Sequence, residues 1–279
     1  MKIFTQLKSI LSALLLGVGL SASAATPLTF AVVPQSRPEQ VFSDWQPVLK
    51  ELTRRTGVQF KLLTYPSIPD FEAAFLKGQP DLAYLNPYHA VMAKQAAGYL
   101  PIVRDGATSL TGILVVRKDS AIERVEQLDG ATLAFPAPNA FGASLYMRAL
   151  LAEKFKIKIN PLYVTTHPNV HRNVILGRAL AGGGVMRTLE KESPEVQAQL
   201  RVLYKTPPAA SHPVVVHHRV PTKMRDAVQS AFLAMGADAA FAERLGAIHV
   251  PTPVKADYGK DYAPLQALHL ERLVELGTE

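Results

Sequence analysis

The chain has 279 residues, of which 48% are hydrophobic and 19% are charged, and its formal net charge is +7 at pH 7. This composition is typical of a globular protein and excludes an intrinsically disordered one. The absence of cysteine excludes thiolate nucleophiles, cysteine-ligated zinc and iron–sulfur clusters. Lysine and arginine are scattered, with no run longer than Arg54-Arg55, so the positive charge does not indicate nucleic-acid binding. It favours a field that draws small anions toward a cleft.

The first 25 residues have the three-part layout of a secretory signal peptide. Lys2 and Lys8 give a positive start, residues 10–20 form an uncharged apolar run, and small residues with a cleavage point after Ala24 follow. A bilayer span needs roughly 20 apolar residues, which disfavours the alternative of a membrane anchor. We therefore expect residues 1–24 to be a signal peptide and the mature chain to be exported, with a net charge of about +5.

The hydrophobic pattern of the first part of the mature chain predicts alternating strands and helices. Gly57 and Gly78 stand where two of the helices are expected to end. A β-α-β-α-β-α order indicates an α/β fold with a parallel sheet and helices on both faces. The expected strands cover 29–33, 58–63 and 81–85, and the expected helices cover 39–56, 71–77 and 89–97.

The pattern then restarts, which indicates a second α/β unit. Strands are expected at 111–117, 132–135, 162–165 and 179–185, and helices at 142–154 and 169–176. A returning strand at 213–217 and a helix at 223–235 belong to neither unit alone. We therefore expect two lobes joined by two crossovers, with a ligand cleft between them. The expected lobes are 26–111 with 212–279, and 118–208.

The segment Gly78-Gln-Pro-Asp-Leu-Ala-Tyr-Leu-Asn-Pro-Tyr88 resembles a segment of the periplasmic phosphate/phosphite/phosphonate-binding proteins, the solute receptors of ABC transporters. The resemblance implies a two-lobed type II periplasmic-binding-protein fold that captures a small oxyanion in its cleft for an inner-membrane ABC permease. An alternative with the same fold is a ligand-sensing subunit for a membrane sensor kinase. The resemblance continues in order through residues 111–120, 127–130, 166–167 and 257–262.

Known members of this family hold a tetrahedral anion with a Ser/Thr-rich turn that opens a helix, a histidine of the second lobe and aromatic hydroxyls. The matching turn here, residues 136–144, has lost most of its hydroxyls, although its backbone N–H groups remain suitable donors at a helix N-terminus. Ile68 stands at a position that is often tyrosine. By this resemblance the candidate ligand contacts are Tyr88, Asn139, Phe141, Gly142, Ser144 and His167.

Two further candidates come from the second half of the chain. Where the family places an acid for the amine of an aminophosphonate, Arg187 is the only charge, which favours an anionic ligand without an ammonium group. His212 precedes the returning strand and is expected to face the cleft. Gly182-Gly-Gly184 matches no nucleotide-binding motif and is interpreted as a turn at a lobe edge or as a loop beside the ligand. Gln35, Ser36 and Asn86, in loops after strands, are weaker candidates.

Nothing in the sequence indicates catalysis. Ser144 lacks the second glycine of a nucleophile elbow, and no pair of carboxylates has a spacing that predicts a shared site. His167 and His171 have the i, i+4 spacing of metal ligands, but neither the glutamate of the metalloprotease motif nor a third ligand accompanies them. We therefore expect no catalytic residue, metal or cofactor and a monomeric binding protein. A secreted hydrolase is the least favoured alternative.

Overall fold

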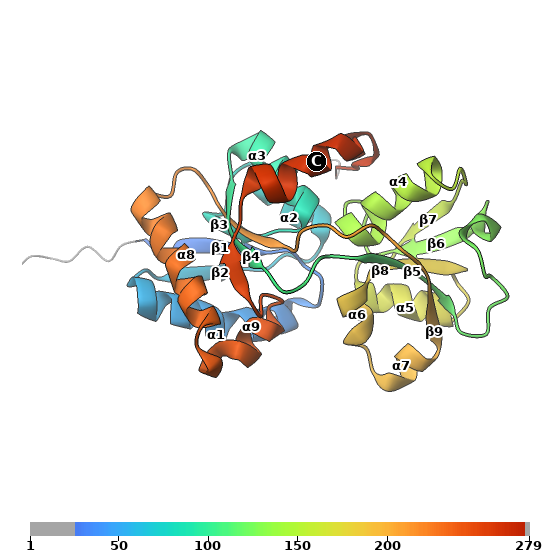
Figure 1. The fold of residues 1–279 in the computed structure, drawn as a ribbon, viewed down its shortest axis with the longest axis horizontal. Coiled ribbons are helices and arrows are strands. Elements are labelled where there is room, and N and C mark those ends of the chain that lie inside the picture. The colour runs from blue at the N-terminus through green and yellow to red at the C-terminus, as the bar shows by residue number, and fades with distance from the viewer. Residues whose placement is uncertain (1–25, 277–279) are drawn as a thin grey trace, which may run out of the picture.

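The computed structural model describes residues 26–276, so the predicted signal peptide and its cleavage point at Ala24 lie outside the described residues. Two α/β halves lie side by side along the long axis of the molecule, each built around its own sheet (Figure 1). This arrangement confirms the predicted α/β class. None of the helices within residues 26–276 is long and apolar enough to cross a membrane.

The half that we call lobe 1 contains both ends of the described chain and a six-stranded sheet. Gly57, at φ 71°, ends its first helix as expected, and the buried Trp45 of that helix packs on Phe30 and Tyr84 of the sheet. In spatial order the strands are β11 (Pro253–Lys255), β4 (Leu100–Asp105), β10 (Pro213–Val216), β3 (Leu82–Tyr84), β1 (Leu28–Val32) and β2 (Phe60–Leu63). Its α-helices are α1 (Pro38–Thr56), α2 (Ile68–Leu76), α3 (Pro87–Ala97), α8 (Thr222–Gly236) and α9 (Ala242–Ala247), and short 3₁₀ or π turns cover Ala239–Phe241, Tyr258–Tyr262, Ala263–Leu268 and Leu270–Leu273.

The other half, lobe 2, is built on a five-stranded sheet. Its strands are, in spatial order, β7 (Asn160–Tyr163), β6 (Thr132–Phe135), β8 (Ala181–Val185), β5 (Gly112–Arg117) and β9 (Leu200–Lys205). Its helices are α4 (Tyr146–Glu153), α5 (His167–Ile175), α6 (Met186–Glu190) and α7 (Pro194–Ala198), together with a 3₁₀ turn at Val125–Leu128. A π-helical turn, Phe141–Leu145, leads directly into α4, so a continuous helical segment begins at Phe141.

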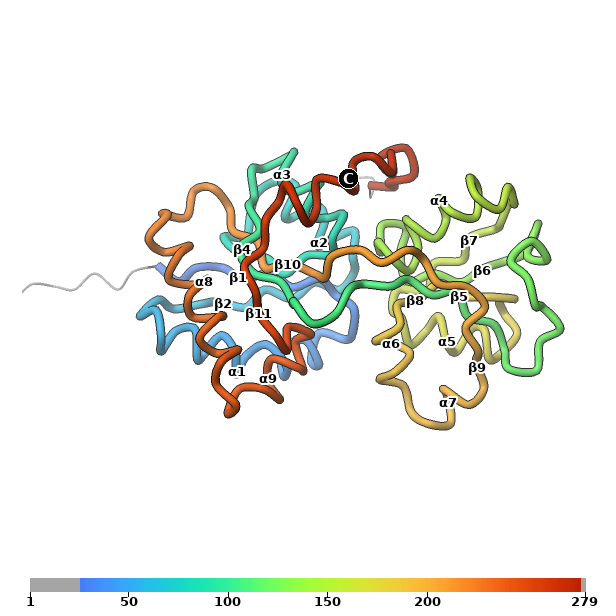
Figure 2. The backbone as a smooth tube through the Cα atoms, in the orientation of Figure 1, coloured from blue at the N-terminus to red at the C-terminus, as the bar shows by residue number. Residues whose placement is uncertain are grey.

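Two crossovers, residues 106–111 and 206–212, connect the lobes and run beside each other (Figure 2). They are tied together by two backbone hydrogen bonds of 2.9 Å between Leu110 and Ala209. The chain leaves lobe 1 on β4 and returns to it on β10, and these two strands pair antiparallel. It enters lobe 2 on β5 and leaves on β9, and these strands also pair antiparallel. Both sheets are therefore mixed, and the expectation of parallel sheets is wrong for the strands that carry the chain between lobes.

Glycines let the π-helical turn lie directly against two strands of lobe 2. A Cβ atom on Gly183 of β8 would lie 1.9 Å from the carbonyl oxygen of Ala143, and one on Gly112 of β5 would lie 2.1 Å from that of Gly142. Gly182–Gly184 are fully buried within β8, so their interpretation as a turn or a ligand loop is wrong. Gly183 lets the backbone of the turn lie on the sheet, and Gly182 makes room for Val170 and Val174 of α5.

A single hydrophobic cluster extends from lobe 1 into the beginning of α4. It includes Phe30, Trp45 and Tyr84 of lobe 1 together with Phe141 and Tyr146 of lobe 2. The apolar core of lobe 1 is thus continuous with the helical segment that starts at Phe141. This contact brings the two lobes together at the π-helical turn.

We expect Gly183→Ala to lower the free energy of unfolding by about 1–3 kcal/mol, because the added methyl group meets a backbone oxygen and must push the turn off the sheet. Chemical denaturation of the mature protein measures this loss. Gly246→Ala is the matched control, since a Cβ atom there meets no atom within 4 Å. Equal stability of the two variants would contradict the requirement for close contact at β8.

Candidate ligand-binding site

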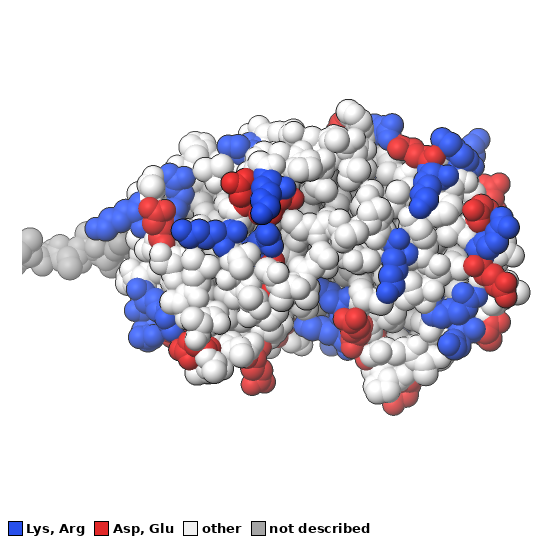
Figure 3. All heavy atoms as spheres, viewed as in Figure 1, with Lys and Arg blue, Asp and Glu red and all other residues white. Residues whose placement is uncertain are grey.

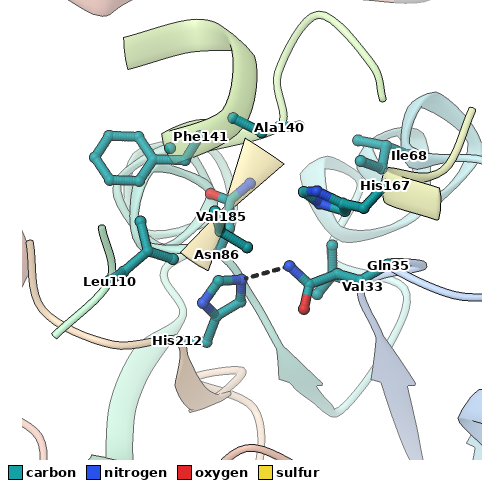
Figure 4. A pocket seen from close by; sticks show the side chains of 12 residues that line it. Val33, Gln35, Ile68, Asn86, Leu110, Ala140, Phe141, His167, Val185 and His212 are labelled. Atoms are coloured by element: carbon teal, nitrogen blue, oxygen red, sulfur yellow. Dashed lines mark hydrogen bonds between the residues drawn. The ribbon is translucent and has the colours of Figure 1, made fainter. Parts of the chain in front are cut away.

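A small cavity lies between the lobes, with walls from both of them (Figure 4). The volume open to the centre of a water molecule is about 10 Å³, close to the least that one water needs. The cleft is therefore closed in this conformation. The cavity is lined by Val33, Gln35, Ile68, Asn86, Leu110, Ala140, Phe141, Gly142, Ala143, His167, Val185 and His212.

The wall from lobe 1 is built at the carboxyl ends of two neighbouring parallel strands. Gln35 follows β1 and Asn86 follows β3, and such strand ends meet at one edge of the sheet. Asn86 is held in place because its side-chain oxygen caps α3, accepting the N–H of His89 at 2.7 Å. His212 is the last residue of the second crossover, and its ring atom Nε2 lies 3.2 Å from the side-chain nitrogen of Gln35. Polar groups of three separate segments thus meet on this side of the cavity.

The wall from lobe 2 is the start of the π-helical turn. Ser144 and Leu145 donate their N–H groups to the carbonyl of Ala140, but no hydrogen bond among the described residues uses the N–H groups of Phe141, Gly142 and Ala143. The first N–H groups of a helix lack intrahelical acceptors and carry the positive end of the helix dipole. Three consecutive residues with unpaired N–H groups therefore line the cavity, which is an arrangement suited to an oxyanion.

Arg187, on α6, brings a positive charge to the same place. One of its terminal nitrogens donates to the side-chain oxygen of Gln35 at 2.9 Å and lies 3.2 Å from a ring nitrogen of His212. Its Nε is buried and has no hydrogen-bond partner within the described residues, and no carboxylate of that part of the chain forms an ion pair with it. Charges of both signs are interspersed on the face shown in Figure 3. The cationic group thus contacts only neutral partners.

Burial keeps the histidines beside Arg187 neutral. It lowers the pKa of His167 to about 3, with smaller contributions from the nearby His171 and Arg187. Burial, followed by the charge of Arg187, also lowers the pKa of His212 well below its usual range. His249 lies near the same group, and burial together with Arg187 and Lys191 lowers its pKa to about 2. Neutral imidazoles can donate from one nitrogen and accept at the other, so they can orient an anion without adding charge.

The structure brings together five of the eight residues that the sequence suggested. Phe141, Gly142, His167 and His212 line the cavity, and Arg187 is hydrogen-bonded to His212. Thr166 caps α5 by accepting the N–H of Asn169 at 3.3 Å, which places His167 in the first turn. Of the weaker candidates, Gln35 and Asn86 lie on the wall, whereas Ser36 does not line it.

Tyr88, Asn139 and Ser144 are not among the residues that line the cavity, because other groups engage their side chains. The Tyr88 hydroxyl lies 3.2 Å from a carboxylate oxygen of Glu271, and burial together with that charge raises its pKa to about 12. The Ser144 hydroxyl accepts a hydrogen bond from Arg148 at 3.3 Å.

Asn139 instead connects the two lobes. Its amide nitrogen donates to the buried Glu72 at 2.9 Å and to the carbonyl of Glu275 at 2.8 Å, while its oxygen accepts the N–H of Glu275 at 3.0 Å. Arg148 of α4 binds the same C-terminal segment, through the Glu275 carboxylate at 2.9 Å and the Leu273 carbonyl at 3.0 Å. The end of the described chain is thus a third connection between the lobes (Figure 2).

Sequence reasoning missed one polar group beside the cluster. Tyr84 of β3 is 2% exposed, and its ring stacks on that of His212 with 5.4 Å between the ring centroids. Its hydroxyl has no hydrogen-bond partner within residues 26–276. The residue lies in an apolar strand, where a tyrosine is indistinguishable from a core residue, so the sequence contained no signal for it.

In the part of the chain that the structure describes, no group of three or more His, Asp or Glu side chains is arranged to hold a metal ion.

The molecule has two α/β lobes that are joined by two crossovers. Between them lies a cavity beside helix N–H groups and an arginine without a carboxylate partner. This architecture defines a type II periplasmic binding protein for an anionic solute. A family model described as "ABC transporter, phosphonate, periplasmic substrate-binding protein" matches residues 30–262. The chain belongs to this family. It is therefore a periplasmic substrate-binding protein of the ABC transporter class and not an enzyme.

The chain is also similar to a named relative, and its fold is similar to those of solved structures. The phosphonates-binding periplasmic protein of Escherichia coli K12 is 23% identical over 261 residues, which cover 87% of this chain and 76% of the relative. The fold is similar to that of a binding protein of an ABC phosphonate transporter from Pseudomonas aeruginosa, with a TM-score of 0.77, 19% identity and coverage of 88% and 87% of the two chains. It is also similar to a Prochlorococcus marinus protein in complex with methylphosphonate, with a TM-score of 0.78, 16% identity and coverage of 88% and 97%.

The buried neutral histidines predict a loss of stability in mild acid. The pKa of His167 is about 3 in the folded protein and near 6.5 in the unfolded chain, so the unfolded chain binds more protons between these values. We therefore expect the free energy of unfolding to decrease between pH 7 and pH 5, and His167→Gln to decrease less over that interval. Urea denaturation at the two pH values measures the difference.

The exposed His218 provides the control, because His218→Gln removes an imidazole that solvent already reaches. We expect this variant to keep the pH dependence of the original protein. A His167→Gln variant with the same pH dependence as His218→Gln would contradict the assignment of a neutral, buried His167.

Proposed function

We propose that this protein binds a small phosphonate, or a phosphorus oxyanion of similar size, in the cavity between its lobes and delivers it as a monomer to an ABC permease. The observation that carries the proposal is the set of three unpaired N–H groups of Phe141–Ala143 on the wall of a cavity that Arg187 adjoins without a carboxylate partner. Helix N–H donors and a guanidinium are complementary to tetrahedral oxyanions.

The chemistry of the walls narrows the class of ligand. No residue that lines the cavity is acidic, so an ammonium group on the ligand would find no counter-charge there. The family description and the Prochlorococcus relative, which was solved with methylphosphonate, support phosphorus over other oxyanions. Binding and closure would equally serve a membrane sensor kinase, but the family description favours the transporter.

Binding requires the lobes to separate, because the present cavity holds little more than a water molecule. The paired crossovers at Leu110 and Ala209 are suited to act as the hinge, since they are the two backbone connections between the sheets. An anion that enters replaces Gln35 and His212 as the partner of Arg187, which then pairs with an opposite charge. Closure around the anion then excludes water from these contacts.

The proposal is tested by isothermal titration calorimetry of the mature protein with phosphite, methylphosphonate, phosphate, sulfate and 2-aminoethylphosphonate. We expect phosphite or methylphosphonate to bind most tightly and the aminophosphonate to bind weakly. A ligand at a hundred times its Kd should also raise the free energy of unfolding by about 2.7 kcal/mol. Lack of binding by every phosphorus oxyanion would refute the proposed ligand class.

The contribution of Arg187 is tested by Arg187→Met. We expect this variant to weaken binding of the preferred oxyanion by about 30-fold, since loss of a buried charged partner costs about 2 kcal/mol or more. Arg178→Met removes the same charge from an exposed position on lobe 2 and should leave the Kd unchanged. Equal affinities of the two variants would show that the anion does not bind at Arg187.

A further inference from the structure

Phe141 is one of the residues that line the cavity, and its aromatic ring is held by two others. Phe141 is 2% exposed and lines the cavity, and its ring is nearly parallel to those of Tyr88 and Tyr146, with interplanar angles of 9° and 11°. The ring centroids lie 6.3 Å and 5.6 Å from that of Phe141, within the range of offset stacking. We call Tyr88, Phe141 and Tyr146 the ring stack. Tyr88 belongs to lobe 1, so the stack crosses the cleft.

Each lobe holds its own part of the ring stack in place, Tyr88 in lobe 1 and Phe141 in lobe 2. Tyr88 is buried in α3, and its hydroxyl is anchored to Glu271. Phe141 begins the turn whose backbone lies on Gly112 and Gly183. A Phe141 ring that is held by its own backbone and by two neighbouring rings has little freedom to move away from a ligand.

The rest of the cavity wall around Phe141 is also apolar and buried. Val33, Ile68, Leu110 and Val185 are between 2% and 6% exposed. The polar groups, by contrast, are the turn N–H groups, Gln35, His167 and His212, with Arg187 beside them. Because these groups take the oxygens of a bound oxyanion, its substituent must face the apolar wall.

Space for the oxyanion is more easily made on the side of Arg187. This side chain is held by neutral hydrogen bonds only, and it also lines an adjoining hollow of about 270 Å³ between the crossovers and α6, together with Glu190 and Lys205. Arg187 can move into that hollow, whereas the ring stack is packed within the core. Once the lobes have closed on a ligand, the cavity can therefore gain room toward Arg187 but not toward Phe141.

We propose that Phe141 sets an upper limit on the organic substituent of the ligand, so that the site accepts phosphite and methylphosphonate and rejects phosphonates with longer alkyl chains. This inference rests on the proposed function and specifies the substrate class of the same site. Forcing additional methylene groups into a packed apolar site costs about 1–3 kcal/mol. That cost corresponds to a decrease in affinity of about 5-fold to 150-fold between methylphosphonate and propylphosphonate.

The test compares the Kd values of methyl-, ethyl- and propylphosphonate, measured by calorimetry, for the original protein, Phe141→Ala and Phe141→Leu. The readout is the ratio of the propyl to the methyl Kd within each protein, so any overall weakening by the substitution cancels. We expect this ratio to be at least 5 in the original protein, smaller in Phe141→Leu and near or below 1 in Phe141→Ala. If Phe141→Ala fails to fold, Phe141→Leu alone tests the inference.

Phe155→Ala is the matched control, because Phe155 contacts Tyr204 at 4.9 Å within lobe 2 and does not line the cavity. This variant should keep the original ratio. An original protein that binds all three phosphonates equally, or a ratio that is unchanged in the Phe141 variants, would overturn the inference while leaving the proposed function intact. Lack of binding of both phosphite and methylphosphonate to the original protein would instead overturn the proposed function, and this inference with it.

Discussion

Backbone contact between the turn Phe141–Leu145 and strands β5 and β8 is the constraint on which the site depends. A helix over a sheet is normally separated from it by a layer of side chains. Gly112 and Gly183 remove that layer, so the carbonyl groups of the turn lie against the strands themselves. Because α6 follows β8 without a loop, the same strand also carries Arg187 to the cavity. One strand thereby fixes the distance between the helix N–H donors and the cationic side chain.

The charge balance of the closed cleft follows from that placement. Arg187 is surrounded by Gln35, His167 and His212, which are neutral under the conditions of the periplasm because burial lowers the pKa of both histidines. Arg187 is partly buried, and its positive charge has no carboxylate partner among the described residues. Under the proposed function an anion supplies this partner when it binds, which would couple ligand capture to the closed form. The Asn139 and Glu275 contacts add a further connection that closes only when the lobes meet.

The sequence predicted the α/β class and most helices, because apolar periodicity and terminal glycines are local signals. It missed β4, β9 and the short strand β11. In β4, Pro101 interrupts the strand pattern and lies where the pairing with β10 shifts register, and β9 is only partly buried at the sheet edge. His212 was found from its position before a strand, whereas His167 was found from the family resemblance. The prediction that Tyr88 contacts the ligand did not anticipate its bond to Glu271, 183 residues away in the chain, which no local pattern indicates.

The most direct measurement is a crystal structure of the mature protein with methylphosphonate. Oxyanion capture by the helix start predicts phosphonate oxygens within hydrogen-bond distance of the N–H groups of Phe141, Gly142 and Ala143. It also predicts a direct contact with the guanidinium of Arg187, with the methyl group against the Phe141 ring. A phosphonate bound away from this turn, or one whose oxygens contact neither the N–H groups nor Arg187, would contradict it.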